Sequence, residues 1–118
     1  MRQFIIAGAL ALAATTVVSA QEIGGTYDVA GTNLNGSEYT GTAEITSLSE
    51  TTCSIDWNTG ETTSSGVCMR NGIAFAAAHV QGDILGLLIY EIQEDGSMVG
   101  YWTVAGMDGA GTETLTPQ

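Results

Sequence analysis

Basic residues are almost absent from this sequence. It contains no lysine, and two arginines stand against 13 aspartates and glutamates, for a formal net charge of −11. A surface of this charge repels phosphate backbones and anionic headgroups, so we expect neither nucleic acid nor an anionic membrane as a partner. The acids occur singly, as is typical of the solvated outer faces of strands, and we place them there: Asp28, Glu38, Glu44, Asp56, Glu91 and Glu113.

Long hydrophobic runs are also missing. The one extended apolar segment covers residues 4–13, directly after Arg2, and small residues follow at Val18-Ser19-Ala20. This is the pattern of a cleaved secretory signal peptide, and the segment is too short to anchor the chain in a bilayer. We therefore expect residues 1–20 to be removed, without membrane insertion of the mature chain. A single domain at 21–118 would remain, secreted or periplasmic, with Arg70 as its one base against 13 acids.

Catalytic groups are scarce as well. His79 is the only histidine, and the sequence has no G-x-S-x-G elbow, no H-E-x-x-H motif and no D-x-D-x-D-G calcium loop. The two cysteines are expected to pair with each other, which leaves no thiol for nucleophilic catalysis or zinc. We expect a protein that is not an enzyme and has no cofactor or metal, and we interpret His79 as structural.

The two cysteines lie in a stretch that predicts three consecutive antiparallel strands. If Gly60 and Glu61 form a two-residue turn, Cys53 falls directly opposite Cys68, where a cross-strand disulfide fits. Two cysteines in an exported chain are most simply a disulfide. The next reversal, at Asn71-Gly72, then predicts that Phe75 lies opposite Cys68.

Alternating polar and apolar residues extend this pattern over the whole mature chain, and no window has a helical period. We predict strands at 25–32, 38–47, three within 52–80, 84–92, 97–105 and 110–116. Short turns join all of them. Mid-strand glycines at 31, 41, 66, 86, 100 and 111 indicate bends at the corners of a closed barrel. The predicted fold is all-β: one eight-stranded antiparallel up-and-down barrel.

Aromatic side chains are predicted to point into this barrel. For the strand at 97–105 we prefer a three-residue loop at Glu94–Gly96, because it buries Trp102. The inward set is then Tyr27, Tyr39, Trp57, Phe75, Tyr90 and Trp102. An eight-stranded interior is either packed by such side chains or holds one small ligand, and the sequence leaves both open. Arg70, beside the Asn71-Gly72 turn, is expected at a barrel mouth, where it would hold a ligand carboxylate or pair with an acid.

Five stretches resemble a family of small exported bacterial β-proteins, some of them labelled fibronectin-binding protein. They are GTYxVxGTN from Gly25, YxGxxxI from Tyr39, SGxxMRNG from Ser65, GLxxYEI from Gly86, and DGSxxGxWTxAGxxGxGTExLTP from Asp95. The resemblance covers the mature chain and implies export and a compact β-fold. In architecture the chain is also similar to calycin barrels such as lipocalins and avidins, which begin with glycine and an aromatic residue on the first strand.

Three non-catalytic functions remain open at this point, and one of them is a purely structural component of the cell envelope. The resemblance implies a module that binds a host or matrix protein. The alternative is a carrier that holds a small ligand among the aromatic side chains, with Arg70 at the mouth. An apolar pocket open at one end would favour the carrier, and a filled interior with an exposed aromatic patch would favour the module. In either case we expect a monomer.

Overall fold

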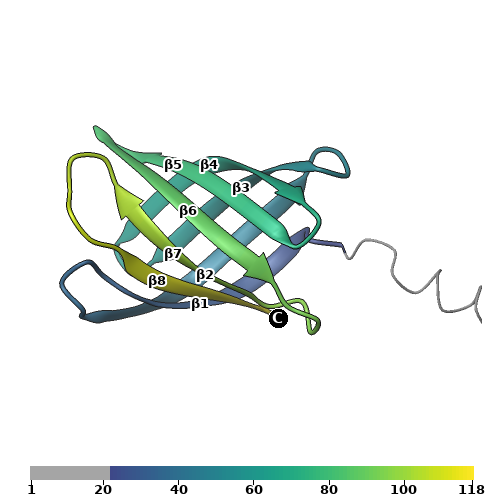
Figure 1. The fold of residues 1–118 in the computed structure, drawn as a ribbon, viewed down its shortest axis with the longest axis horizontal. Coiled ribbons are helices and arrows are strands. Elements are labelled where there is room, and N and C mark those ends of the chain that lie inside the picture. Colours follow the sequence, from purple (N-terminus) through teal and green to yellow (C-terminus); the bar gives the residue numbers. More distant parts are fainter. Residues whose placement is uncertain (1–21) are drawn as a thin grey trace, which may run out of the picture.

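Eight antiparallel strands form a closed barrel in the computed structural model, which describes residues 22–118 (Figure 1). The predicted signal peptide at 1–20 lies outside the described residues. The strands are β1 (Gly25–Thr32), β2 (Glu38–Ser47), β3 (Thr52–Thr59), β4 (Thr62–Asn71), β5 (Ala74–Gln81), β6 (Ile84–Ile92), β7 (Met98–Val104) and β8 (Gly111–Pro117). Each strand pairs with the next, and β1 pairs with β8. The all-β, up-and-down barrel predicted from the sequence is confirmed.

The turns of such a barrel alternate between its two ends. Those of β1–β2, β3–β4, β5–β6 and β7–β8 lie at one end, and those of β2–β3, β4–β5 and β6–β7 lie at the other with the carboxyl terminus (Figure 1). Within residues 22–118, no helix is long and apolar enough to cross a membrane.

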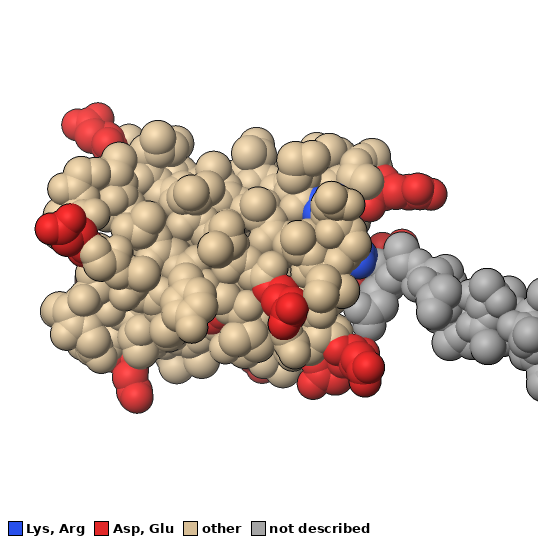
Figure 2. All heavy atoms as spheres, in the orientation of Figure 1, with Lys and Arg blue, Asp and Glu red and all other residues tan. Residues whose placement is uncertain are grey.

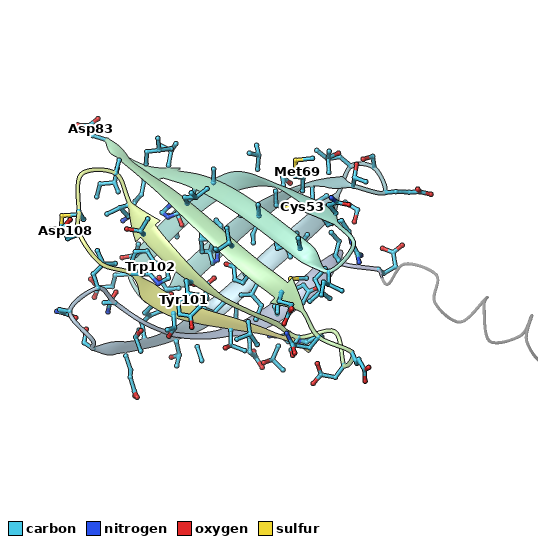
Figure 3. The ribbon with its side chains drawn as sticks, viewed as in Figure 1. Cys53, Met69, Asp83, Tyr101, Trp102 and Asp108 are labelled. Atoms are coloured by element: carbon cyan, nitrogen blue, oxygen red, sulfur yellow. A yellow bond between two sulfur atoms is a disulfide. The ribbon has the colours of Figure 1, made fainter. Side chains whose placement is uncertain are left out.

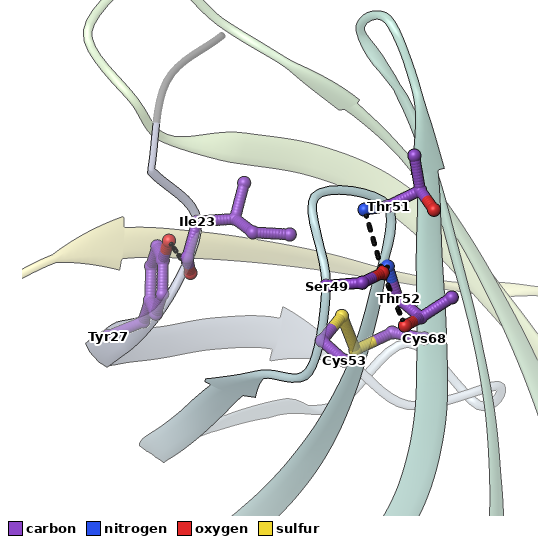
Figure 4. Close-up of a disulfide and its surroundings, with 7 residues drawn as sticks. All are labelled: Ile23, Tyr27, Ser49, Thr51, Thr52, Cys53 and Cys68. Carbon is purple, nitrogen blue, oxygen red and sulfur yellow. Dashed lines mark hydrogen bonds between the residues drawn. A yellow bond between two sulfur atoms is a disulfide. The ribbon is translucent and has the colours of Figure 1, made fainter.

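The end that carries the termini is filled. Its core contains Phe75, Ile55, Met98 and Leu115, all at most 1% exposed. Ile23, which precedes β1, is buried at this end of the barrel, and its carbonyl accepts a 2.6 Å hydrogen bond from the hydroxyl of Tyr27 (Figure 4). This end therefore has no room for a ligand.

The disulfide between Cys53 and Cys68 lies in the same filled end (Figure 4). Cys53 is directly opposite Cys68, and Thr59 pairs with Thr62 around a turn with Gly60 at a φ of 82°. The predicted pairing and its turn are therefore confirmed. A disulfide is typical of oxidising compartments outside the cytoplasm.

One predicted register is wrong, and another is confirmed. Asn71 is still paired, with Ala74, so the β4–β5 turn is centred on Gly72 and Ile73 instead of Asn71 and Gly72. Phe75 consequently lies opposite Arg70, and Ala77 lies opposite Cys68. Gly72, at the first central position of this turn, has a φ of 63°, a conformation that glycine adopts without strain.

For β7, the three-residue loop at Glu94–Gly96 is confirmed. Gln93 and Ser97 are joined by a backbone hydrogen bond of 2.8 Å across it. Met98 and Gly100 are buried, and Trp102 packs against the core. A two-residue turn at Asp95-Gly96, the other possibility that the sequence allows, would have left this indole on the outside of the barrel.

Candidate functional site

A cavity of about 680 Å³ occupies the other half of the barrel and opens at the end away from the termini. In Figure 3, Asp83 and Asp108 mark this open end, and Cys53 lies toward the filled one. The rim comes from the turns at this end. The walls carry ring side chains from four strands: Tyr39 of β2, Trp57 of β3, His79 of β5 and Trp102 of β7.

Glu113 of β8 lies in the cavity wall with only 3% of its surface exposed. Its Oε1 accepts a 2.6 Å hydrogen bond from the Tyr39 hydroxyl. Its Oε2 accepts one of 2.6 Å from the Tyr90 hydroxyl and one of 2.9 Å from Nε1 of Trp57. An indole N–H can only donate, and the short O–H···O distances are those of charge-assisted bonds. The arrangement fits an ionised carboxylate held rigidly inside the barrel.

Glu113 was predicted to lie on the outer surface, and this prediction is wrong. In β8 the inward positions are Gly111, Glu113 and Leu115, and they alternate with threonines that face outward. The alternation itself contained the signal, because Glu113 shares the period-2 face of Leu115. A buried carboxylate is tolerated because three donors replace the water that it loses.

The carboxylate and the burial of the tyrosines act together on their acidity. Burial raises the pKa of Tyr39 above its ordinary value of 10.0, and the negative charge of Glu113 and the hydrogen bond to it raise this pKa further. The same causes, in the same order, raise the pKa of Tyr90. Both hydroxyls therefore keep their protons and remain donors to Glu113.

His79 lines the cavity beside Trp57, with ring centroids 5.4 Å apart and the planes at 62°. Its Nδ1 is buried and has no hydrogen-bond partner. Burial lowers the pKa of His79, and the charge of Glu113 opposes that shift in part. His79 is therefore held in the wall as a neutral imidazole whose buried Nδ1 is unsatisfied.

Glycines on neighbouring strands make room for three of these rings. Tyr39 lies opposite Gly31, His79 opposite Gly86, and Trp102 opposite Gly111. A Cβ added at any of these glycines would collide with the paired ring. The mid-strand glycines taken as corner bends thus have a more specific role, because they let aromatic side chains lie flat against the wall.

The rim beside β1 is fixed by polar groups of its own loop. Asn33 and Ser37 are joined by a 2.7 Å backbone bond, and the Asn35 side chain accepts hydrogen bonds from Ser37. Trp102 donates from Nε1 to the carbonyl of Thr32 at 3.1 Å. This part of the mouth is therefore held in place without a ligand.

The residues proposed from the sequence divide between the two halves of the barrel. Tyr39, Trp57 and Trp102 line the cavity. Tyr90 binds Glu113 from below, while Tyr27 and Phe75 belong to the filled end. Glu113, which also lines the cavity, was not predicted as a site residue. His79 was predicted to have a structural role, and the structure places it in the cavity wall.

Arg70 is not at the mouth of this cavity. It lies in β4 just before the β4–β5 turn at the filled end, and its guanidinium donates to the carbonyl of Gly72 at 3.2 Å and 2.9 Å. The basic side chain visible in Figure 2 lies at the end where the termini are. Arg70 is not among the residues that line the cavity, so the structure does not bring it together with the aromatic side chains that line it.

The cavity carries one negative charge. Glu113 is the one charged residue among those that line it. In the part of the chain that the structure describes, no group of three or more His, Cys, Asp or Glu side chains could hold a metal ion. What the walls offer a guest is aromatic surface and a carboxylate.

Comparison with known proteins identifies the fold alone. No family model matches the sequence, and no curated protein is significantly similar to it. A redesigned β-barrel of known structure has a TM-score of 0.69, with 18% identity over 81% of this chain and 91% of its own. A de novo designed fluorescence-activating β-barrel has a TM-score of 0.64, with 15% identity over 80% and 93%. Neither comparison supports the resemblance to exported bacterial β-proteins.

Proposed function

We propose that this protein is a non-catalytic carrier that binds a small, partly apolar organic cation in the cavity of its barrel. The observation that carries the proposal is Glu113, a buried carboxylate in an aromatic wall that contains no lysine or arginine. The volume of about 680 Å³ lies within the usual range of small-molecule sites, roughly 300–1,000 Å³.

The aromatic walls favour a positive charge. Indole and phenol faces attract cations through the negative face of the ring, and indole does so most strongly. Trp57 and Trp102 are the two tryptophans of the chain, and both line the cavity with Tyr39. The apolar part of a guest would contact these rings and Leu88, while its charge would be placed near Glu113.

Glu113 has capacity left for such a guest. A carboxylate can accept about four hydrogen bonds, and three are made within the protein. An ammonium or protonated heterocycle could take the remaining position. An anion would be repelled by the negative charge of Glu113 at close range. The proposed preference for a cation is therefore the opposite of the anionic ligand that was expected when Arg70 was placed at the mouth.

The charge of the whole protein acts in the same direction. With 13 acids and no lysine, the chain attracts cations toward its surface, and attraction of this kind raises association rates at low ionic strength. The disulfide supports a location in the periplasm or outside the cell, where the carrier would meet ligands from the medium.

The other hypothesis, a module for a host or matrix protein, predicted a filled interior. Half of the interior is a cavity, which supports the carrier instead. We therefore propose the carrier and not the protein-binding module.

Three ligands of one shape but different charge test this proposal: phenylbutylamine, phenylbutanol and phenylbutyrate. Because both tryptophans line the cavity, their fluorescence reports binding directly, and the melting temperature reports it independently. We expect the amine to change the fluorescence and raise the melting temperature, the alcohol to do so weakly, and the acid not at all.

The matched variants are Glu113→Gln in the cavity and Glu38→Gln on the exposed face of β2. The first should remove the preference for the amine, and the second should keep it. Equal binding of all three ligands by the parent, or no binding of any aromatic amine, would contradict the proposal.

A further inference from the structure

The outer surface of the barrel has two unlike halves. Outward positions on β1, β2, β3 and β8 are dominated by threonine, serine, aspartate and glutamate. Outward positions on β4 to β7 are mostly apolar, and the exceptions are Thr63, Ser65, Asn71, Glu91 and Thr103. We call this second half the apolar face and define it by Val67, Met69, Leu87, Ile89, Val99 and Tyr101, which are between 47% and 67% exposed.

The face is continuous across four strands. Met69 pairs with Ala76, Ala76 with Ile89, and Ile89 with Tyr101, so one row of cross-strand neighbours crosses the barrel. Figure 3 shows Met69 pointing away from the barrel. Residues that lie side by side in this way form one patch instead of scattered exposed side chains.

A second row lies beside the first. Val67 pairs with Ala78, and Ala78 with Leu87, the latter 54% exposed. The alanines of β5 lie between larger side chains of β4 and β6 in both rows. They form a shallow trough into which side chains from another surface could pack.

The acids avoid this face. In Figure 2, the side on which β6 and β7 lie in front is mostly uncharged, and most acidic side chains lie around its outline. The nearest acid on these strands is Glu91, beside Val99 at the edge toward the filled end. Monomeric soluble proteins rarely expose an apolar patch of more than a few hundred Å², and larger patches are typical of interaction surfaces.

The charges show which partner fits. A lipid surface is normally contacted through basic side chains at the edge of an apolar face, and Arg70 is the one basic residue in the described part of the chain. A cationic protein would seek the acidic half of the barrel, not this uncharged one. A surface with no charge of its own is complementary to another uncharged apolar surface, and a second copy of the chain provides one.

The area agrees with this assignment. Six half-exposed large side chains, with the alanines between them and Val80 and Leu85 beside them, offer on the order of 800 Å², which is what each partner contributes to a standard interface. Two β-sheet faces pack well against each other at an angle of about 30° between strand directions. The barrel mouth lies at the end of the molecule, so such packing leaves the cavity open.

We propose that two copies of the protein associate through their apolar faces in an isologous dimer. This replaces the monomer expected from the sequence. Each copy carries a large negative charge, so the two halves repel each other at long range, while the contact itself is uncharged. The dimer is therefore favoured by salt, which screens the repulsion, whereas an interface built on ion pairs is weakened by salt.

Sedimentation equilibrium of the protein, with its disulfide intact, tests this proposal at low and high salt. We expect the mass of a dimer, with a dissociation constant that falls as salt is added. The triple variant Leu87→Thr/Ile89→Thr/Tyr101→Thr replaces three side chains of the apolar face by threonine. Threonine is common at outward positions in the polar half of the barrel and has a high strand propensity, so the strands should be kept. The triple variant should dissociate with a constant at least about a hundredfold higher, since three central apolar side chains are lost.

The control variant is Thr40→Ser/Thr42→Ser/Thr114→Ser on the polar half, which should dimerise like the parent. Tryptophan fluorescence and a cooperative melt verify that each variant is folded. A parent that stays monomeric at high salt and millimolar concentration overturns the proposal. So does a dimer that the triple variant leaves unchanged, or a monomer that instead binds phosphatidylcholine vesicles.

Discussion

Trp57 of β3 donates a 2.9 Å hydrogen bond to Glu113 of β8, a residue 56 positions later in the chain. These strands are not neighbours in the sheet, so the bond crosses the interior of the barrel. With the hydroxyls of Tyr39 and Tyr90, side chains from β2, β3 and β6 meet at one carboxylate of β8. This cross-barrel network separates the filled half from the cavity and sets the charge of the latter.

Replacing Glu113 by glutamine should destabilise the protein. The amide has one acceptor oxygen where the carboxylate has two, so at least one of three buried donors loses a charge-assisted partner. We expect the free energy of unfolding to fall by roughly 1–3 kcal/mol in urea titrations. Glu38→Gln, at an exposed position, should leave it unchanged. Equal or greater stability of Glu113→Gln would show that the network does not stabilise the fold.

Alkaline pH should unfold the protein through its buried tyrosines. The pKa values of Tyr39 and Tyr90 are raised in the folded state, first by burial and then by Glu113. Above the unfolded value of about 10.0 the unfolded chain loses protons that the folded chain retains, so stability decreases as pH rises further. Tyrosinate absorbance should show Tyr39 and Tyr90 ionising only with unfolding. Tyr39→Phe/Tyr90→Phe should have a smaller loss of stability above this pH.

Mild acid should also reduce stability, through His79. Its pKa is lowered by burial, so below 6.5 the unfolded chain binds a proton that the folded chain does not yet bind. The contribution of His79 is therefore present above pH 6.5 and is lost as pH falls through the lowered value. His79 is the single histidine of the chain, so its ring protons can be followed by NMR without ambiguity. A midpoint at or above 6.5 would contradict the burial argument.

The disulfide should support stability without affecting the cavity. Cys53→Ala/Cys68→Ala removes the cross-link from a loop with a sequence separation of 15, which costs roughly 3 kcal/mol in the entropy model. Because both cysteines lie in the filled end, the folded variant should bind phenylbutylamine as the parent does. Chemical denaturation and fluorescence titration measure the two effects separately. Loss of binding in a folded variant would show that the two halves of the barrel are coupled.

The fold was predictable because each strand carries its own period-2 pattern and every turn except the one between β2 and β3 contains a glycine. Cys53 and Cys68 could be paired from the turn at Gly60 alone, since a hairpin register is a local property. The turn at Gly72 was harder, because two adjacent pairs of residues both fit a two-residue hairpin, and the choice between them depends on packing against β6.

The site was less accessible to sequence reasoning. Composition suggested that acids are solvated, and this holds for Glu38 and Glu44 but fails for Glu113. What makes Glu113 acceptable inside is three donors from β2, β3 and β6, and no local pattern reveals that they meet. Arg70 was proposed as a site residue because it is the one basic residue of the predicted mature chain. The sequence does not reveal which end of the barrel is hollow, because this depends on the summed volumes of side chains from all strands.

The pairing of β1 with β8 also decides how the protein can be handled. Pro117 lies opposite Tyr27, and the backbone N–H of Gln118 binds the carbonyl of Thr26 at 3.0 Å, so the carboxyl terminus lies beside β1 at the filled end. A fluorescent label, an affinity tag or a solid support joined at Gln118 would therefore face away from the cavity mouth. Immobilised in this way, the barrel would present its opening to the solution, an orientation suited to a sensor surface for small cations.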